Sequence, residues 1–188
     1  AAWKLSGFPA RRVIGSGTVL DTARFRYLLS EHLDLDPRNV HAYVVGEHGD
    51  SEVPIWSLAN VAGMRLEEYC RRTLCDVGDE VRDRISHQVR DAAYEVIERK
   101  GATYYAVGVA LVRIVEAILR DQHTVLTVSN LVPGYYGIED VYFSLPAVVA
   151  REGVERVVEL SLVQEEIEAL ERCAGVLQGV LDEIALPD

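Results

Sequence analysis

The first apolar repeat along the chain has helical spacing. In residues 18–35, apolar side chains recur every three or four positions, as on the buried face of an amphipathic helix: Phe25, Leu28, Leu29 and Leu33. Pro37 closes this segment, because proline disrupts a continuing helix. The next run, 39–46, is rich in β-branched residues and predicts a strand that ends at a glycine.

Three further helices are expected before residue 120. Residues 57–73 predict a short helix that is interrupted near Gly63. Residues 77–100 carry an apolar stripe and are followed by Gly101, the usual residue after a helix end. The segment 104–119 is apolar on almost every side, which predicts a helix buried within the protein.

Strand-like runs follow, at 123–130, 140–149 and 154–162, and turn sequences join them. They predict an antiparallel meander. The chain then ends in an amphipathic helix, for which Ser161 and Gln164 are expected to form a capping box. This order predicts an α+β fold in which long helices pack on antiparallel strands, rather than an alternating βαβ plan.

Composition limits the class of partner. The 188 residues fit one domain or a large part of a two-domain protein, and the net charge of −11 disfavours nucleic acid and anionic membranes as partners. No run of about 18 apolar residues predicts a membrane span. Three cysteines without CxxC spacing predict reduced, packing thiols in a cytoplasmic protein: Cys70, Cys75 and Cys173.

The glycines at 15–17 do not form a dinucleotide fingerprint. In "GSGTVL", residues 15–20, Leu20 stands where the third glycine of GxGxxG belongs. The apolar run before it, Val13 and Ile14, is too short for a central strand. This stretch therefore predicts no nucleotide site of its own.

Three polar side chains are candidates for chemistry. Asp21 and Arg24 are three positions apart on an expected helix, so they share a face. One alternative is an ordinary surface ion pair between them. In the other, they act separately: the guanidinium of Arg24 binds a carboxylate through two hydrogen bonds, and the carboxylate of Asp21 holds a histidine. His48 follows a strand between Gly46 and Gly49, and is either an ordinary loop histidine or a group that gains and loses a proton near neutral pH.

Two other site classes fit the sequence poorly. A metal site from His41 and His48 would need both rings on one side, but seven positions along a strand place them on opposite faces. Ser51 lies near His48 without the G-x-S-x-G elbow of a hydrolase. We therefore expect no metal and no serine nucleophile.

The segments "GSGTVLDTARFR" (15–26) and "GEHGDSEVPIWS" (46–57) together resemble the L-lactate dehydrogenase family, and within it the bacterial enzymes. The likeness continues through "KGATYYAVG" (100–108) and "SLPAVV" (144–149) and spans essentially all 188 residues. It implies that residues 1–188 are the C-terminal, substrate-binding domain. The family's N-terminal NAD-binding Rossmann domain is not present in this sequence.

The resemblance assigns roles to the candidate residues. It implies that His48 gives and takes the proton, that Asp21 fixes the ring of that histidine, and that Arg24 clamps the substrate carboxylate. Thr103 would line the substrate pocket. The implied reaction is reversible hydride transfer between pyruvate and L-lactate, with NAD as the cofactor; Ser16 and Val107 match positions that touch its nicotinamide end.

The resemblance also implies regulation and assembly. Bacterial members bind fructose 1,6-bisphosphate between subunits, and Arg26 and His41 stand at the matching positions; the alternative is a pair of ordinary surface residues. A homotetramer is expected. Two other functions stay open: a lactate-dehydrogenase-like malate dehydrogenase, and a non-catalytic oligomerising or ligand-binding domain.

Overall fold

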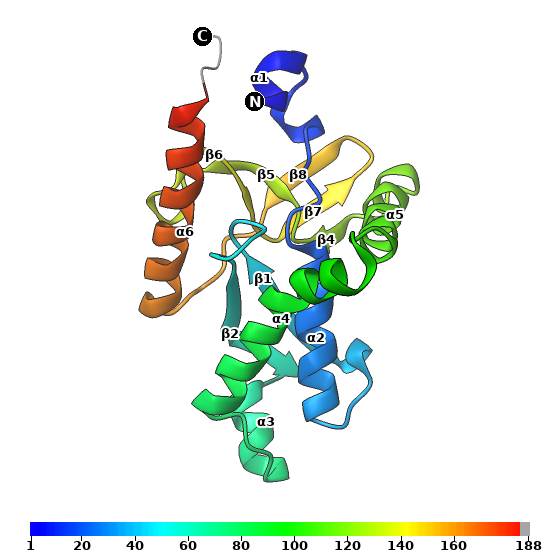
Figure 1. Cartoon of the computed structure of the whole chain (residues 1–188), viewed down its shortest axis with the longest axis vertical. Coiled ribbons are helices and arrows are strands. Elements are labelled where there is room, and N and C mark those ends of the chain that lie inside the picture. Colours follow the sequence, from blue (N-terminus) through cyan, green and yellow to red (C-terminus); the bar gives the residue numbers. More distant parts are fainter. Residues whose placement is uncertain (185–188) are drawn as a thin grey trace.

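The computed structural model describes residues 1–184 and contains helices packed on small antiparallel sheets (Figure 1). The helices are α1 (Ala2–Ser6), α2 (Val19–His32), α3 (Leu66–Thr73), α4 (Asp79–Lys100), α5 (Tyr105–Leu119) and α6 (Gln164–Glu183). The strands are β1 (Val40–Val45), β2 (Val53–Val61), β3 (Met64–Arg65), β4 (Thr124–Leu126), β5 (Ser129–Pro133), β6 (Glu139–Ser144), β7 (Ala147–Ala150) and β8 (Gly153–Val157). The predicted α+β class is confirmed.

Every strand pair is antiparallel, and the pairs form three small sheets within the described residues: β1-β2-β3, β4-β7-β8 and β5-β6. The predicted meander is only partly right. Strands β5 and β6 pair with each other in a sheet of their own, and β4 pairs with β7, which follows them in the sequence. Two isolated bridges, Gly15 with Ser129 and Gly46 with Ser144, join the sheets around the start of α2.

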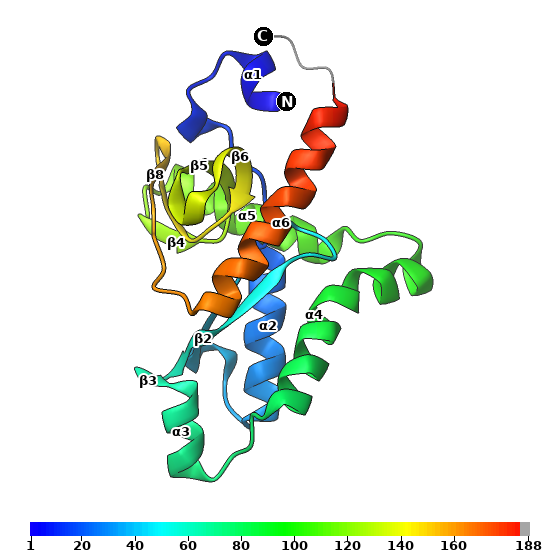
Figure 2. The ribbon, with the colours of Figure 1, turned by 90° about the vertical axis from the view of Figure 1, so that its left-hand side faces the viewer.

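The core lies where helices cover these sheets. Phe25 and Leu29 of α2 are fully buried against β1, α3 and α4, and α2 packs along α4 (Figure 2). A second cluster joins β2, β6 and α6 around Phe143 and Leu170, while a third lies under α5. Helices α5 and α6 lie on opposite sides of the later strands (Figures 1 and 2).

Two helix predictions are wrong in detail. Residues 57–61 continue β2, and the helix of this segment, α3, begins only at Leu66. The alternating burial of β2 explains the difference, since a strand buries every second side chain. Helix α5 is present, but only one face of it is buried, the face with Ile114 and Ala117; on the other face Tyr105 is 77% exposed and Val109 71%. Helix α5 lies at the edge of the molecule (Figure 1), and the face that carries Tyr105 and Val109 is open to solvent.

The expected capping box of the last helix is also wrong. Helix α6 begins at Gln164 and its capping residue is Val163, so Ser161 lies outside it. The carboxylate of Glu166 accepts hydrogen bonds from the backbone N–H of Val163 at 3.4 Å and of Ser57 at 3.0 Å. Glu166 therefore accepts from an amide at the start of α6 and at the same time connects α6 to β2.

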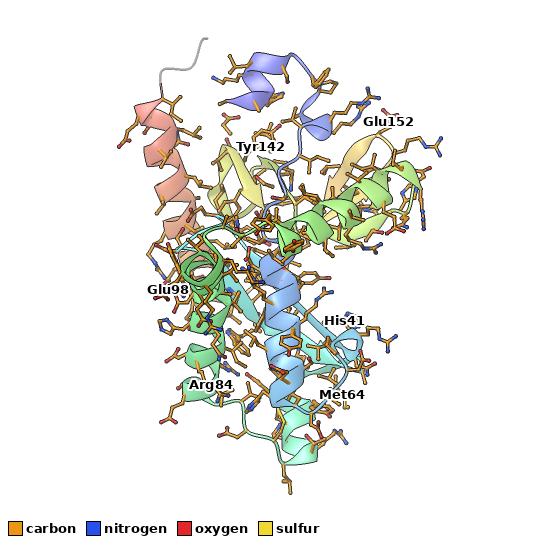
Figure 3. The ribbon with its side chains drawn as sticks, turned by 45° about the vertical axis from the view of Figure 1, so that its right-hand side comes forward. His41, Met64, Arg84, Glu98, Tyr142 and Glu152 are labelled. Atoms are coloured by element: carbon orange, nitrogen blue, oxygen red, sulfur yellow. A yellow bond between two sulfur atoms is a disulfide. The ribbon has the colours of Figure 1, made fainter. Side chains whose placement is uncertain are left out.

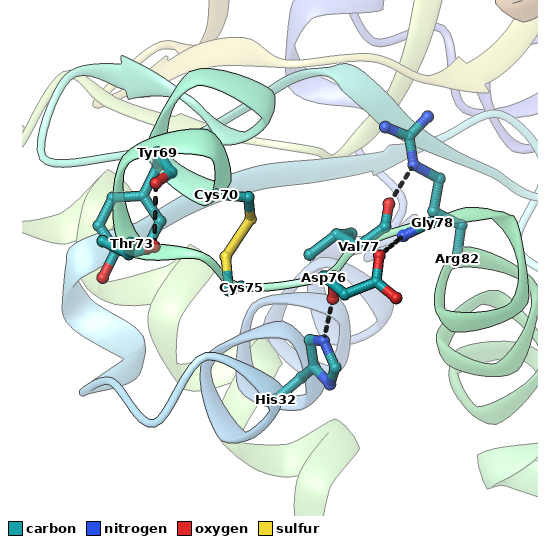
Figure 4. Close-up of a disulfide and its surroundings, with 9 residues drawn as sticks. All are labelled: His32, Tyr69, Cys70, Thr73, Cys75, Asp76, Val77, Gly78 and Arg82. Atoms are coloured by element: carbon teal, nitrogen blue, oxygen red, sulfur yellow. Dashed lines mark hydrogen bonds between the residues drawn. A yellow bond between two sulfur atoms is a disulfide. The ribbon is translucent and has the colours of Figure 1, made fainter.

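The prediction of reduced thiols is wrong for two of the three cysteines. Cys70 and Cys75 form a disulfide at the end of α3 (Figure 4). Leu74 adopts a left-handed conformation with φ 59°, which turns the chain back and brings the two Cα atoms within 4.6 Å. Cys173 is free and buried, as expected of a packing thiol. No helix among residues 1–184 is long and apolar enough to cross a membrane.

Candidate active site

Two threonines fix the start of α2 against β1. The hydroxyl of Thr18 donates to the Val44 carbonyl at 2.6 Å, and the hydroxyl of Thr22 accepts from the Val44 N–H at 3.0 Å. Gly17, with φ 52°, lets the residue before Thr18 lie close to the start of β5, since a Cβ there would lie 2.5 Å from the backbone nitrogen of Ser129. The first turn of α2, which carries Asp21, is therefore held at the end of β1.

The turn after β1 carries His48 and rests on α6. Gly46 has φ 100°, and a Cβ there would lie 2.7 Å from the sulfur of Cys173. That sulfur accepts the backbone N–H of Glu47 at 3.0 Å. The Gly46 N–H also donates to the Ser144 carbonyl at 2.8 Å, so the strand end is held from two sides. His48 thus projects from a well-supported turn.

Asp21 lies between the other two candidate residues. Its Oδ1 accepts from Arg24 Nη1 at 3.0 Å, and its Oδ2 lies 2.7 Å from His48 Nδ1. The Asp21 side chain is only 2% exposed, against 18% for Arg24 and 52% for His48. The expected ion pair of Asp21 and Arg24 is therefore present, but it is buried and shared with the histidine.

This contact changes the proton affinity of the ring. Hydrogen bonding to Asp21 raises the pKa of His48 above its usual range, while partial burial acts against the rise. Because a carboxylate only accepts hydrogen bonds, the 2.7 Å contact favours the form of His48 that has a proton on Nδ1. Nε2 is then the ring atom that can exchange a proton with a ligand.

Glu52 is a fourth titratable group at the site, and the sequence analysis did not single it out. It is 6% exposed, and one oxygen of each of Asp21 and Glu52 and one ring nitrogen of His48 lie within 4.8 Å of one another. Burial, together with the charge of Asp21, raises the pKa of Glu52 to about 8. A chain position four residues past His48 gives no sign of such burial, which arises from its neighbours in space.

The three groups also form a donor set of the type that binds transition metals. The 2.7 Å contact between Asp21 and His48 already uses one donor of each.

The remaining expected site residues surround the contact of α2 with α5. Ser16 lies in the turn before α2, Thr103 lies between α4 and α5, and Val107 lies in the first turn of α5; all three are half-buried. Across the described part of the chain, no side-chain hydrogen bond joins them to Asp21, Arg24 or His48.

Arg26 and His41 lie at a different place from the histidine site. Arg26 Nε donates to the Ala42 carbonyl of β1 at 2.9 Å, and its guanidinium lies over the ring of Tyr43. Burial lowers the pKa of Arg26. His41, the residue before Ala42, is exposed at the outside of β1 (Figure 3). The structure thus places both on neighbouring parts of β1 and α2.

The geometry can be compared with known proteins. A model of the lactate/malate dehydrogenase alpha/beta C-terminal domain matches residues 18–186. The chain belongs to the lactate/malate dehydrogenase family. The match covers Asp21, Arg24 and His48, as well as Glu52 and Cys173.

Individual members of the lactate/malate dehydrogenase family are similar over almost the whole chain. An L-lactate dehydrogenase of Moorella thermoacetica is 55% identical over 186 residues, covering 98% of this chain and 59% of that protein. An L-lactate dehydrogenase 1 of Clostridium acetobutylicum is 54% identical, covering 97% and 58%. The chain therefore spans a little under three fifths of these relatives.

Solved structures of the family agree with the fold. A minor L-lactate dehydrogenase of Enterococcus mundtii, in its ligands-bound form, superposes with a TM-score of 0.93 at 42% identity, covering 98% of this chain and 59% of that one. A lactate dehydrogenase from a Medee basin deep-sea metagenome library gives 0.94 at 47% identity, with the same coverage.

Proposed function

We propose that this chain is the substrate-binding domain of a cytoplasmic, NAD-dependent L-lactate dehydrogenase. An N-terminal NAD-binding domain would complete the enzyme, consistent with relatives named L-lactate dehydrogenase that are longer than the chain. The single observation that carries the proposal is the buried carboxylate of Asp21, in contact with both His48 and Arg24.

In this reaction His48 handles the proton. A 2-keto acid becomes a 2-hydroxy acid when a hydride reaches its carbonyl carbon and a proton reaches its oxygen. NAD, when bound in its reduced form, supplies the hydride. His48 Nε2 gives the proton to the oxygen, and takes it back when lactate is oxidised. Asp21 keeps the other nitrogen protonated and balances the charge of the ring.

Arg24 binds the carboxylate of the substrate. Within the described residues, its hydrogen bond to Asp21 uses Nη1 alone and leaves further N–H groups of the fork for a ligand. Thr103 would line the pocket for the rest of the molecule. Pyruvate and L-lactate are the substrates that fit this assignment.

The residues present fit the nicotinamide end of NAD. Ser16 offers a hydroxyl in the turn before α2 and Val107 an apolar side chain in the first turn of α5, and both are half-buried. The exposed apolar face of α5 also fits a covering domain, with Val109 at 71% and Val112 at 65% exposure. Ser16 and Val107 would thus hold the ring near the substrate.

We further propose a homotetramer that fructose 1,6-bisphosphate activates. Arg26 of α2 donates to the carbonyl of Ala42, the residue after His41 on β1, and a two-fold axis would bring a second copy of these basic side chains to the site. Activation requires tighter binding of the bisphosphate to the active state.

Arg24→Lys in the complete enzyme tests the proposed substrate. Lysine keeps the charge but loses the planar fork, so the KM for pyruvate should rise about tenfold or more. Steady-state assays of NADH oxidation measure it, with oxaloacetate in place of pyruvate to separate lactate from malate dehydrogenase activity. An unchanged KM, or a preference for oxaloacetate in the parent enzyme, would contradict the assignment.

A further inference from the structure

The carboxyl group of Glu52 is buried without the partners that usually accompany burial. The residue immediately precedes β2 and is 6% exposed. Among the described residues, no hydrogen-bond partner is found for its Oε1, nor for the buried Nε of Arg90. Buried polar groups are nearly always paired, so an unpaired acid beside a reacting histidine needs an explanation.

The neighbouring charges decide which of the two buried carboxyl groups, Asp21 or Glu52, is ionised. An oxygen of Glu52 lies within 4.8 Å of an oxygen of Asp21, and two carboxylates this close do not both ionise easily. Asp21 has the guanidinium of Arg24 and the ring of His48 in contact. Asp21 therefore takes the negative charge, and Glu52 keeps its proton.

We propose that Glu52 is a positioning residue for proton transfer at His48. When Glu52 is a neutral acid, Asp21 is the negatively charged partner of His48. When Glu52 is ionised, its charge makes His48 hold its proton more tightly. This inference rests on the proposed function, because it concerns the proton that His48 exchanges. Glu52 itself need not touch the substrate; it acts through the histidine.

The groups around Glu52 come from four parts of the fold. Burial and the charge of Asp21 raise the pKa of Glu52 to about 8, while charges on the histidine turn, α4 and α2 lower it: His48, Arg90 and Arg24. In return, the charge of Glu52 raises the pKa of His48 and that of the Cys173 thiol on α6. Glu52 also lines an open groove of about 720 Å³ between β2, α4 and α6, through which its proton can reach solvent.

The two titrations are therefore coupled. Around pH 8 about half of the Glu52 side chains have lost their proton, and the new charge makes the His48 imidazolium harder to deprotonate. Pyruvate reduction needs that imidazolium, so its alkaline limb should lie at higher pH with Glu52 than without it.

Glu52→Gln in the complete enzyme tests this coupling, because glutamine keeps the shape of a neutral acid that never ionises. The pH dependence of kcat/KM for pyruvate reduction reports the free enzyme. We expect the midpoint of its alkaline limb to fall by about half a pH unit or more, as one charge at this distance requires even in water. Asp50→Asn is the matched control: it removes an exposed carboxylate two residues away, and the midpoint should move less.

An unchanged midpoint in Glu52→Gln overturns the inference. If the variant fails to fold, infrared spectra of the parent enzyme decide: a carboxylic-acid band should be present at pH 7, fall to about half around pH 8 and be nearly gone about one pH unit higher. Its absence at pH 7 also overturns the inference. The proposed function fails separately, by full activity of an enzyme without His48.

Discussion

At the scale of single residues, the site depends on one aspartate with two partners. Helical spacing alone predicted that Asp21 and Arg24 share a face, and the 3.0 Å contact confirms it. The contact of Asp21 with His48 joins residues 27 positions apart: spacing left it as one of two alternatives, and the family resemblance assigned it. Glu52 was missed because the charges that act on its carboxyl group come from residues far away in the sequence, such as Asp21 of α2 and Arg90 of α4, and no local pattern around Glu52 records them.

Glu52 should also make stability depend on pH. Its pKa rises from 4.5 to about 8 on folding, so the folded state keeps a proton that the unfolded chain releases. Stability is therefore lost as pH rises from about 4.5 to 8. Glu52→Gln removes this loss, and its gain over the parent should grow to about 1–3 kcal/mol at pH 7–8.

Denaturant midpoints at pH 5 and pH 8, compared between parent and variant, measure this effect. Asp50→Asn, which removes an exposed charge from the same turn, should show no such growth with pH. An equal gain at both pH values would mean that Glu52 is ionised in the folded protein.

At the scale of elements, the turn after β1 holds the site together. The β-branched run predicted β1 correctly, and the apolar repeats predicted α2, α4 and α6. The helix predicted over 57–73 was wrong in its first part, because the pairing of β2 with β1 overrides the local pattern. Likewise, the role of Cys173 under the histidine turn depends on how α6 packs, which the stripe along α6 does not specify.

Gly46→Ala tests the role of this turn. The added Cβ would lie 2.7 Å from the Cys173 sulfur at a φ of 100°, so the turn must shift. We expect a loss of about 2–4 kcal/mol in unfolding free energy and a lower turnover of the complete enzyme. Gly175→Ala is the control. Gly175 lies on α6, and a Cβ there would have no neighbouring atom of another element within 4 Å, so this variant should raise the free energy of unfolding by about 0.5–1 kcal/mol. Equal behaviour of the two variants would show that the turn has no special constraint.

At the scale of the whole molecule, α5 shows what its sequence could not settle. Apolar residues on every side predicted burial, and the structure leaves one face of α5 open (Figure 1). A sequence records that a face is apolar but not whether the same chain covers it. This face is consistent with the proposed NAD-binding domain and with subunit contacts.

Arg26→Gln tests the proposed regulation of the assembled enzyme. Each proposed site at the two-fold axis loses two guanidinium groups, one from each subunit, so the apparent affinity of the enzyme for fructose 1,6-bisphosphate should fall at least tenfold. Titration of the rate with the bisphosphate at fixed pyruvate measures it. Arg38→Gln, an exposed arginine paired with Asp36, should respond like the parent. A normal response of Arg26→Gln would place the effector elsewhere.

The most direct test of the central claim is the turnover of His48→Asn in the complete enzyme. Asparagine fills similar space but cannot give a proton to the carbonyl oxygen at neutral pH. The rate of pyruvate reduction should fall by about two to four orders of magnitude, while NADH binding, followed by its fluorescence, persists. Turnover equal to that of the parent would contradict the assignment of His48 as the proton donor.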